Sequence, residues 1–109
     1  LDIINLNGGK ISETYGVPIT EIQEGIKHGV RKVNIDTDLR LAATAAIRKY
    51  FVENPNQFDP RKYLIESKKE MKNIVIKRLT EFKSADKASK IKPIPLSVMS
   101  KKYSSGELY

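Results

Sequence analysis

The chain has 109 residues and carries 20 basic against 13 acidic side chains, a formal net charge of +7 at neutral pH. This length fits one small domain or part of a larger one, and it excludes a complete eight-fold α/β barrel, which needs about 250 residues. Because the chain has no cysteine, disulfide bridges, thiolate metal sites and a cysteine nucleophile are excluded. No apolar run approaches the roughly 18 residues of a membrane span and no secretory signal is visible, so we expect a cytoplasmic protein without a membrane partner.

The positive charge belongs to the second half of the sequence. Residues 1–58 hold 7 basic and 7 acidic side chains, whereas residues 59–109 hold 13 basic and 6 acidic ones. A basic second half is typical of a protein with an anionic partner. It is also typical of a solvated, lysine-rich helix and tail. No zinc-finger, RNP or helix-turn-helix motif is present, so we expect no nucleic-acid partner. A small basic helical module, which binds nucleic acid or forms an oligomer interface without catalysis, stays open as the alternative.

The first elements predicted in chain order are a loop and a short helix. Glycines and a proline mark residues 5–18 as a loop. Thr20 and Gln23 have the three-residue spacing of a capping box, which predicts that a helix begins near Thr20. Gly29 is a suitable end for this helix, because glycine adopts the left-handed conformation without a steric penalty.

A strand and a second helix are predicted next. Val33 and Ile35 are β-branched residues in alternation, which predicts a short strand within residues 30–35. Apolar residues at three- and four-residue spacing then predict a helix over residues 39–52. This helix ends before Pro55, because the residue that precedes a proline avoids the helical conformation.

The last third of the sequence predicts a long helix and a tail. Asp59 before Pro60 is a typical helix start, with aspartate as the cap and proline in the first turn. The helix is predicted to run to Phe82, followed by an extended stretch over residues 90–96 that contains two prolines. One or two further helical turns are predicted over residues 96–103.

A single predicted strand limits the possible fold. The edge groups of one strand need partners, so the strand cannot form a sheet alone. Helix, strand and helix at these lengths are typical of a unit of a parallel α/β sheet. We therefore expect an α/β fold, with the chain as the end of a larger domain or with its strand paired to another chain.

The candidate site lies where the predicted strand passes into the next helix. Asn34 and Asp36 are two residues apart and so point to the same side of a strand. Thr37 adds a hydroxyl group, and Arg40 lies one turn into the helix, whose first amides favour phosphate. Carboxyl ends of parallel strands are where such proteins build their sites. The alternative is a polar strand end in which Asp36 only caps the helix.

Three further features of the sequence bear on a possible site: an aspartate–arginine pair, the lone histidine and a glycine-rich run. Asp59 and Arg61 form a second candidate, because a cation in the first turn of a helix is unfavourable unless it has an anionic partner. The alternative is that Asp59 only caps the helix and Arg61 is a surface residue. The lone histidine, His28, is expected to be structural, since one histidine makes neither a metal site nor a triad. The run Gly8-Gly9-Lys10 lacks the spacing of a phosphate loop.

Four segments together resemble one known family. The match covers residues 1 to about 108 and resembles class II (zinc-dependent) fructose-1,6-bisphosphate aldolase, in its C-terminal third. The segments that carry this resemblance are Gly16-Val17-Pro18, the run from Ile26 to Arg40 that contains Asn-Ile-Asp-Thr-Asp-Leu-Arg, the run Phe58-Asp59-Pro60-Arg61-Lys62-Tyr63-Leu64, and the run from Ala88 to Pro93.

The resemblance implies a fold and a division of the chain. The family fold is a (β/α)8 TIM barrel, of which residues 1–54 would supply the last strand and its helix. Residues 55–109 would supply a C-terminal helical extension and a basic tail. The partners implied are a phosphorylated sugar, the rest of the barrel and further copies in a homodimer or higher homo-oligomer.

The resemblance also implies roles for single residues. Asn34 would be catalytic and would hydrogen-bond the enediolate of dihydroxyacetone phosphate. Asp36 and Thr37 would hold a substrate hydroxyl and the ketose-side phosphate, and Arg40 would bind the far phosphate.

The remaining implications concern the neighbouring subunit and the metal. Asp59 and Arg61 would reach the active site of a neighbouring subunit. The family's zinc is held by three histidines at positions with no match in this chain, so we expect no metal ligand here. The full-length protein would cleave fructose 1,6-bisphosphate in glycolysis and gluconeogenesis, and this chain alone is expected to be inactive. The residues do not separate fructose- from tagatose-bisphosphate preference.

Overall fold

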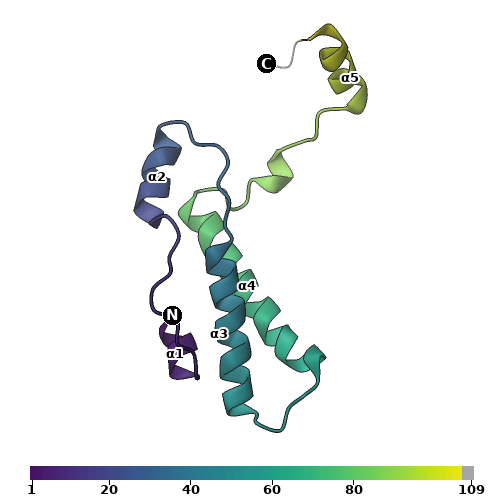
Figure 1. Cartoon of the computed structure of the whole chain (residues 1–109). Helices are drawn as coiled ribbons and strands as arrows, with labels where there is room; N and C mark the ends of the chain where they lie inside the picture. The colour runs from purple at the N-terminus through teal and green to yellow at the C-terminus, as the bar shows by residue number, and fades with distance from the viewer. Residues whose placement is uncertain (107–109) are drawn as a thin grey trace.

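A computed structural model of the chain describes residues 1–106 and shows a helical structure built around one long hairpin (Figure 1). Within these residues every regular element is a helix. The elements in chain order are α1 (Asp2–Leu6), α2 (Ile19–Lys27), α3 (Thr37–Glu53), α4 (Pro60–Glu81), a 3₁₀ helix (Ala88–Lys90) and α5 (Leu96–Ser105). None of the described helices is both long and apolar enough to cross a membrane.

Helices α3 and α4 pack along each other as an antiparallel hairpin (Figure 1). Ala46 on α3 and Ser67 on α4 are both buried, and both are small, which allows two helices to approach closely. Helix α1 packs against α3 and buries Ile4 completely. Gly9 is required beside it, because a Cβ atom at this position would lie 2.5 Å from Cγ2 of Ile4.

The chain buries very little apolar surface. Its radius of gyration is 19.6 Å, whereas a compact domain of 100 residues has about 13 Å. On α4, the apolar side chains of Leu64 and Leu79 are 51% and 43% exposed. Helix α5 lies far from the hairpin, at the end of an extended connection (Figure 1). A stable globular protein covers such faces, so this chain does not form a closed core of its own.

The predicted strand over residues 30–35, and with it the α/β fold and the barrel strand, is wrong for the described chain. Residues 30–36 form no regular structure, and their main-chain hydrogen bonds run only to the adjoining helices, from Val30 to Gly25 and from Arg40 to Asp36. A strand exists only where a neighbour accepts its amide and carbonyl hydrogen bonds, and residues 1–106 offer none. Val33 and Ile35 line an apolar cavity, and they also border a second cavity together with Asn34 and Asp36.

The predicted capping box at the start of α2 is also wrong. The helix begins at Ile19 after Pro18, and no side chain caps it. Gln23 does not reach back to Thr20, because its Nε2 donates to the main-chain oxygen of Glu81 at 3.0 Å. Gly29 does adopt a left-handed conformation with φ of 108°, directly after the end of the helix.

Other element predictions are confirmed or need small changes. The start of α4 is confirmed, since Asp59 Oδ1 accepts from the Arg61 amide at 3.0 Å and Pro60 is the first helical residue. Helix α3 begins at Thr37, two residues before the predicted start. Helix α5 confirms the predicted turns near the end of the chain. Helix α1 was not predicted, because five residues show no periodicity.

The exposed apolar face of α4 leads to a first prediction. The isolated 109-residue chain will bind an apolar fluorescent dye, because a face of this size remains open to water. Replacing Leu64 and Leu79 together by serine will lower the dye fluorescence without reducing helical circular dichroism. The control variant Lys68→Ser will leave the fluorescence unchanged. Equal dye binding by all three proteins would contradict the exposure of this face.

Candidate functional site

The junction between the extended segment and α3 carries the first group of predicted site residues. Asn34 is exposed, and Thr37 is the first residue of the helix. Together with Asp36 they line an open cavity of about 530 Å³ between this junction and α2. The first amides of α3 have no partners within the helix and so can donate to an anion. The junction therefore gathers an amide, a carboxylate and a hydroxyl group in one wall.

Arg40 joins this group through an ion pair. Its Nε donates to Asp36 Oδ1 at 2.9 Å, and the two side chains are 78% and 68% exposed. Asp36 was predicted as a possible helix cap, and it occupies the cap position of α3 without a side-chain capping bond. Its carboxylate instead holds the Arg40 guanidinium beside the start of the helix. An exposed ion pair contributes little to stability, so both groups can exchange partners when a charged ligand arrives.

Asp59 and Arg61 form the second group, at the start of α4. Nη2 and Nε of Arg61 donate to Asp59 Oδ2 at 2.8 and 3.1 Å, while the Arg61 side chain stays 86% exposed. The side-chain and main-chain hydrogen bonds from Arg61 lower the pKa of Asp59 below its usual value. The same side-chain bond raises the pKa of Arg61. The aspartate thus caps the helix and orients an exposed guanidinium.

The two groups do not meet within one chain. Asp36 and Arg40 lie at the start of α3, whereas Asp59 and Arg61 follow the connection at its far end (Figure 1). Helix α3 has 17 residues, a length of about 25 Å at 1.5 Å per residue. One ligand of the size of a sugar phosphate cannot touch both groups on the same hairpin.

A third set of charged residues was missed by the sequence analysis. Arg78 on α4 donates from Nε and Nη2 to Asp38 Oδ2 at 2.9 and 2.8 Å, and from Nη1 to Glu81 Oε2 at 2.6 Å. Burial acts to lower the pKa of Arg78, but its hydrogen bonds and the two negative charges outweigh this and raise it. Asp38 and Arg78 are 40 residues apart, so no spacing rule could pair them.

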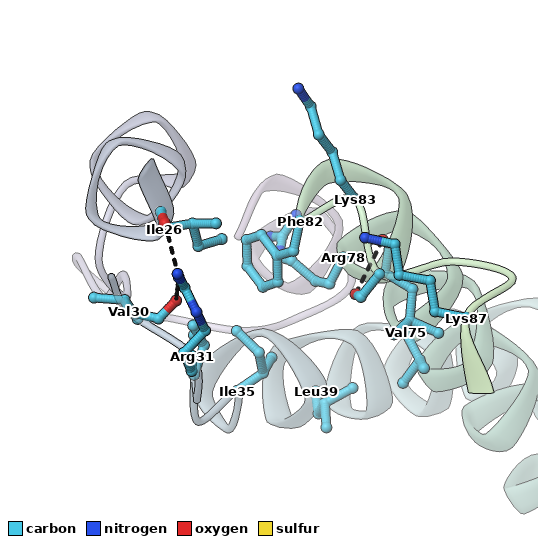
Figure 2. Close-up of a pocket in the computed structure, with 13 residues that line it drawn as sticks. Ile26, Val30, Arg31, Ile35, Leu39, Val75, Arg78, Phe82, Lys83 and Lys87 are labelled. Carbon is cyan, nitrogen blue, oxygen red and sulfur yellow. Dashed lines mark hydrogen bonds between the residues drawn. The ribbon is translucent and has the colours of Figure 1, made fainter. Parts of the chain in front are cut away.

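A second cavity lies beside this network and is mainly apolar. It has a volume of about 570 Å³ and lies between α2, the start of α3 and the end of α4 (Figure 2). Ile35, Leu39 and Phe82 are among its apolar walls, and Arg31 turns back to donate to the main-chain oxygens of Ile26 and Val30 at 3.1 Å (Figure 2). Such walls suit an apolar packing partner better than a charged sugar.

The described residues do not form a metal site. Within residues 1–106 no group of three histidine, cysteine, aspartate or glutamate side chains is placed to hold an ion. His28 lies at the exposed end of α2, where Nε2 is 3.1 Å from Glu24 Oε1. A catalytic zinc needs three protein ligands, so a metal would have to be held by residues outside this stretch.

Comparison with known proteins places this arrangement in a family. The family model described as fructose-bisphosphate aldolase class-II matches residues 8–87. The chain is 60% identical over 108 residues to a fructose-bisphosphate aldolase of Stutzerimonas stutzeri and 59% identical to one of Pseudomonas aeruginosa. It is 55% identical over 108 residues to a protein of Synechocystis named fructose-bisphosphate aldolase class 2. Each match covers 99% of this chain and 30% of the relative.

The chain therefore belongs to the class II fructose-bisphosphate aldolase family. It spans about 30% of the length of the curated relatives it matches. The matched residues include both candidate groups and the Asp38–Arg78–Glu81 network.

The ion pair at the start of α4 gives a second prediction. Since the pKa of Asp59 is lowered in the folded chain, its contribution to the stability of α4 is present above the usual pKa and is lost as the pH falls through the lowered one. An NMR titration will place the Asp59 carboxyl midpoint below about 3.9. Arg61→Ala will raise the midpoint, while Lys62→Ala, which removes only a nearby charge, will raise it less. Equal shifts in both variants would contradict the hydrogen-bonded pair.

Proposed function

We propose that this chain is part of a zinc-dependent lyase that reversibly cleaves fructose 1,6-bisphosphate to dihydroxyacetone phosphate and glyceraldehyde 3-phosphate. The observation that carries the proposal is the family match over residues 8–87, together with curated fructose-bisphosphate aldolases that are about 60% identical. The full-length enzyme would act in the cytoplasm, in glycolysis and gluconeogenesis.

The junction at the start of α3 is proposed to hold the ketose half of the substrate. Cleavage of the carbon–carbon bond leaves an electron pair on that half, which becomes an enediolate. The Asn34 amide would donate to an oxygen of this enediolate, where charge develops. Asp36 would accept from a substrate hydroxyl group. The Thr37 hydroxyl and the first amides of α3 would bind the ketose-side phosphate.

The arginines are proposed to bind the far phosphate. Arg40 and Arg61 are both strongly exposed, and a planar guanidinium donates two parallel hydrogen bonds to a phosphate. Asp59 would orient Arg61 through the bonds already present at the start of α4.

The site is proposed to be shared between subunits of a homodimer or higher homo-oligomer. The length of α3 separates Asp59 and Arg61 from the junction of their own chain. In a symmetric pair of subunits, each could offer its α4 start to the other's junction. Residues 1–54 would then supply one half of a site, and residues 55–109 the other.

Zinc is proposed as the cofactor, held by residues outside this sequence. The side chains described here do not provide a donor set for this metal. The chain alone is expected to be inactive, because it holds substrate contacts without metal ligands.

A basic nucleic-acid-binding module is less well supported. Two of the lysines of α4 pair with acidic side chains, Lys69 with Glu66 and Lys77 with Glu81. A phosphate backbone is better matched by an uninterrupted basic stripe.

The third prediction tests the substrate assignment in the full-length enzyme. Arg61→Ala will raise the dissociation constant of a ketose bisphosphate by roughly 10- to 100-fold, the effect of losing a charge-assisted hydrogen bond. The affinity for dihydroxyacetone phosphate, which lacks the far phosphate, will change little. Lys62→Ala is the matched control and will affect neither ligand. Equal weakening of both ligands would argue against the far-phosphate role.

The fourth prediction tests the shared site. Asn34→Ala and Arg61→Ala will each reduce cleavage strongly in homo-oligomers. Mixed oligomers will regain activity, because one site in each mixed pair combines an intact Asn34 with an intact Arg61. Random mixing of dimers should restore about a quarter of the unmodified activity. No recovery in mixed oligomers, with subunit exchange shown by mass spectrometry, would exclude the shared arrangement.

A further inference from the structure

The last turn of α4, which contains Arg78, contacts two helices that precede it in the sequence. Its guanidinium bridges Asp38, in the first turn of α3, and Glu81, at the end of α4. The main-chain oxygen of the same Glu81 accepts from Gln23 on α2. The last turn of α4 therefore holds both helices that flank the extended segment containing Asn34.

The network is the most shielded set of charges among the described ion pairs. The side chains of Arg78, Glu81 and Asp38 are 14%, 24% and 30% exposed, whereas both members of the Asp36–Arg40 pair are more than 65% exposed. A shielded, two-pronged arginine bridge fixes geometry more firmly than an exposed pair, because its partners are hydrogen-bonded in one orientation. Removing the cation would leave the half-buried Asp38 carboxylate without its arginine partner, and Glu81 with only the longer contact to Lys77.

Asp38 is adjacent in sequence to the junction residues. It follows Thr37 directly and lies two residues after Asp36. Asp38 borders the junction cavity, and its carboxylate is bonded to α4, since Oδ2 accepts two bonds from Arg78. A shift of the Asp38 main chain would therefore move the Thr37 hydroxyl and the first amides of α3.

We propose that Arg78 is a positioning residue, which holds the first turn of α3 through Asp38 so that Thr37 and the neighbouring amides face a phosphate. The proposal deepens the proposed function and rests on it. Arg78 does not touch the substrate, and its effect reaches the ligand only through Asp38. Glu81 orients the guanidinium from the other side.

The experiment compares variants of the full-length enzyme. Arg78→Gln and Asp38→Asn will each raise the KM for the bisphosphate and the inhibition constant of inorganic phosphate by about tenfold, because small misplacements of binding groups are costly. The kcat will change by less than about threefold, since the hydrogen bond from Gln23 to the main-chain oxygen of Glu81 stays in place and still anchors the segment that carries Asn34. The double variant will be no worse than either single one, because both break the same link.

The matched control is Lys77→Gln. Lys77 precedes Arg78 and lies 4.0 Å from the same Glu81, but it makes no bond to Asp38. This variant will keep the KM, the phosphate inhibition constant and the amide hydrogen exchange of residues 36–40 at unmodified values. Arg78→Gln will increase that exchange, and Arg78→Lys, which keeps the charge without the planar fork, will give an intermediate result.

The outcomes separate this proposal from the proposed function. Cleavage by the unmodified enzyme tests the function, and the comparison among variants tests the role of Arg78. A lower melting temperature in Arg78→Gln with unchanged KM and unchanged phosphate inhibition would show a purely structural bridge and overturn the proposal. Additive effects in the double variant would overturn it as well. If Arg78→Gln does not fold, Asp38→Asn with its exchange measurement decides the question.

Discussion

The bridge from Arg78 to Asp38 and Glu81 is the interaction on which the arrangement of the candidate site depends. It holds the start of α3 to the end of α4, and Gln23 adds α2 to the same point. The extended segment between α2 and α3 has no sheet partner in the described residues, so its position follows from these anchors at its two ends. A partly buried charged bridge costs solvation energy, and its contribution here is the fixed geometry that it imposes.

The hairpin of α3 and α4 also keeps the two candidate groups apart. Helix α3 is long enough to keep the Asp59–Arg61 pair away from the junction, although each group holds an exposed arginine beside an aspartate. Exposed apolar residues such as Leu64 and Leu79 show that the hairpin has faces built to be covered. Charged groups at both ends and apolar faces between them are the features of a part that functions within a larger assembly.

Much of this helical structure could be predicted, because its signals are local. The Asp59–Pro60 start needs only a capping carboxylate and a fixed proline φ, and both are visible in two residues. The strand over residues 30–35 could not be predicted correctly, because alternation shows a residue's preference and not whether a neighbouring strand exists. The prediction of the Thr20–Gln23 cap was wrong for a similar reason, because Gln23 donates to a main-chain oxygen 58 residues away in sequence.

The charged residues of the candidate site show the same limit of prediction from local sequence patterns. Asp36 and Arg40 are four residues apart, so the sequence grouped them at one site, but it did not predict the ion pair between them. Asp38 and Arg78 are brought together only by the packing of α3 on α4, which no pattern of either helix specifies. Asp38 stands between the junction residues in the sequence, yet its carboxylate serves the opposite side of the helix. Neighbouring polar residues at the start of a helix can thus have different roles, since some face a cavity and others bond to a packed helix. Only the tertiary contacts show which residue has which role.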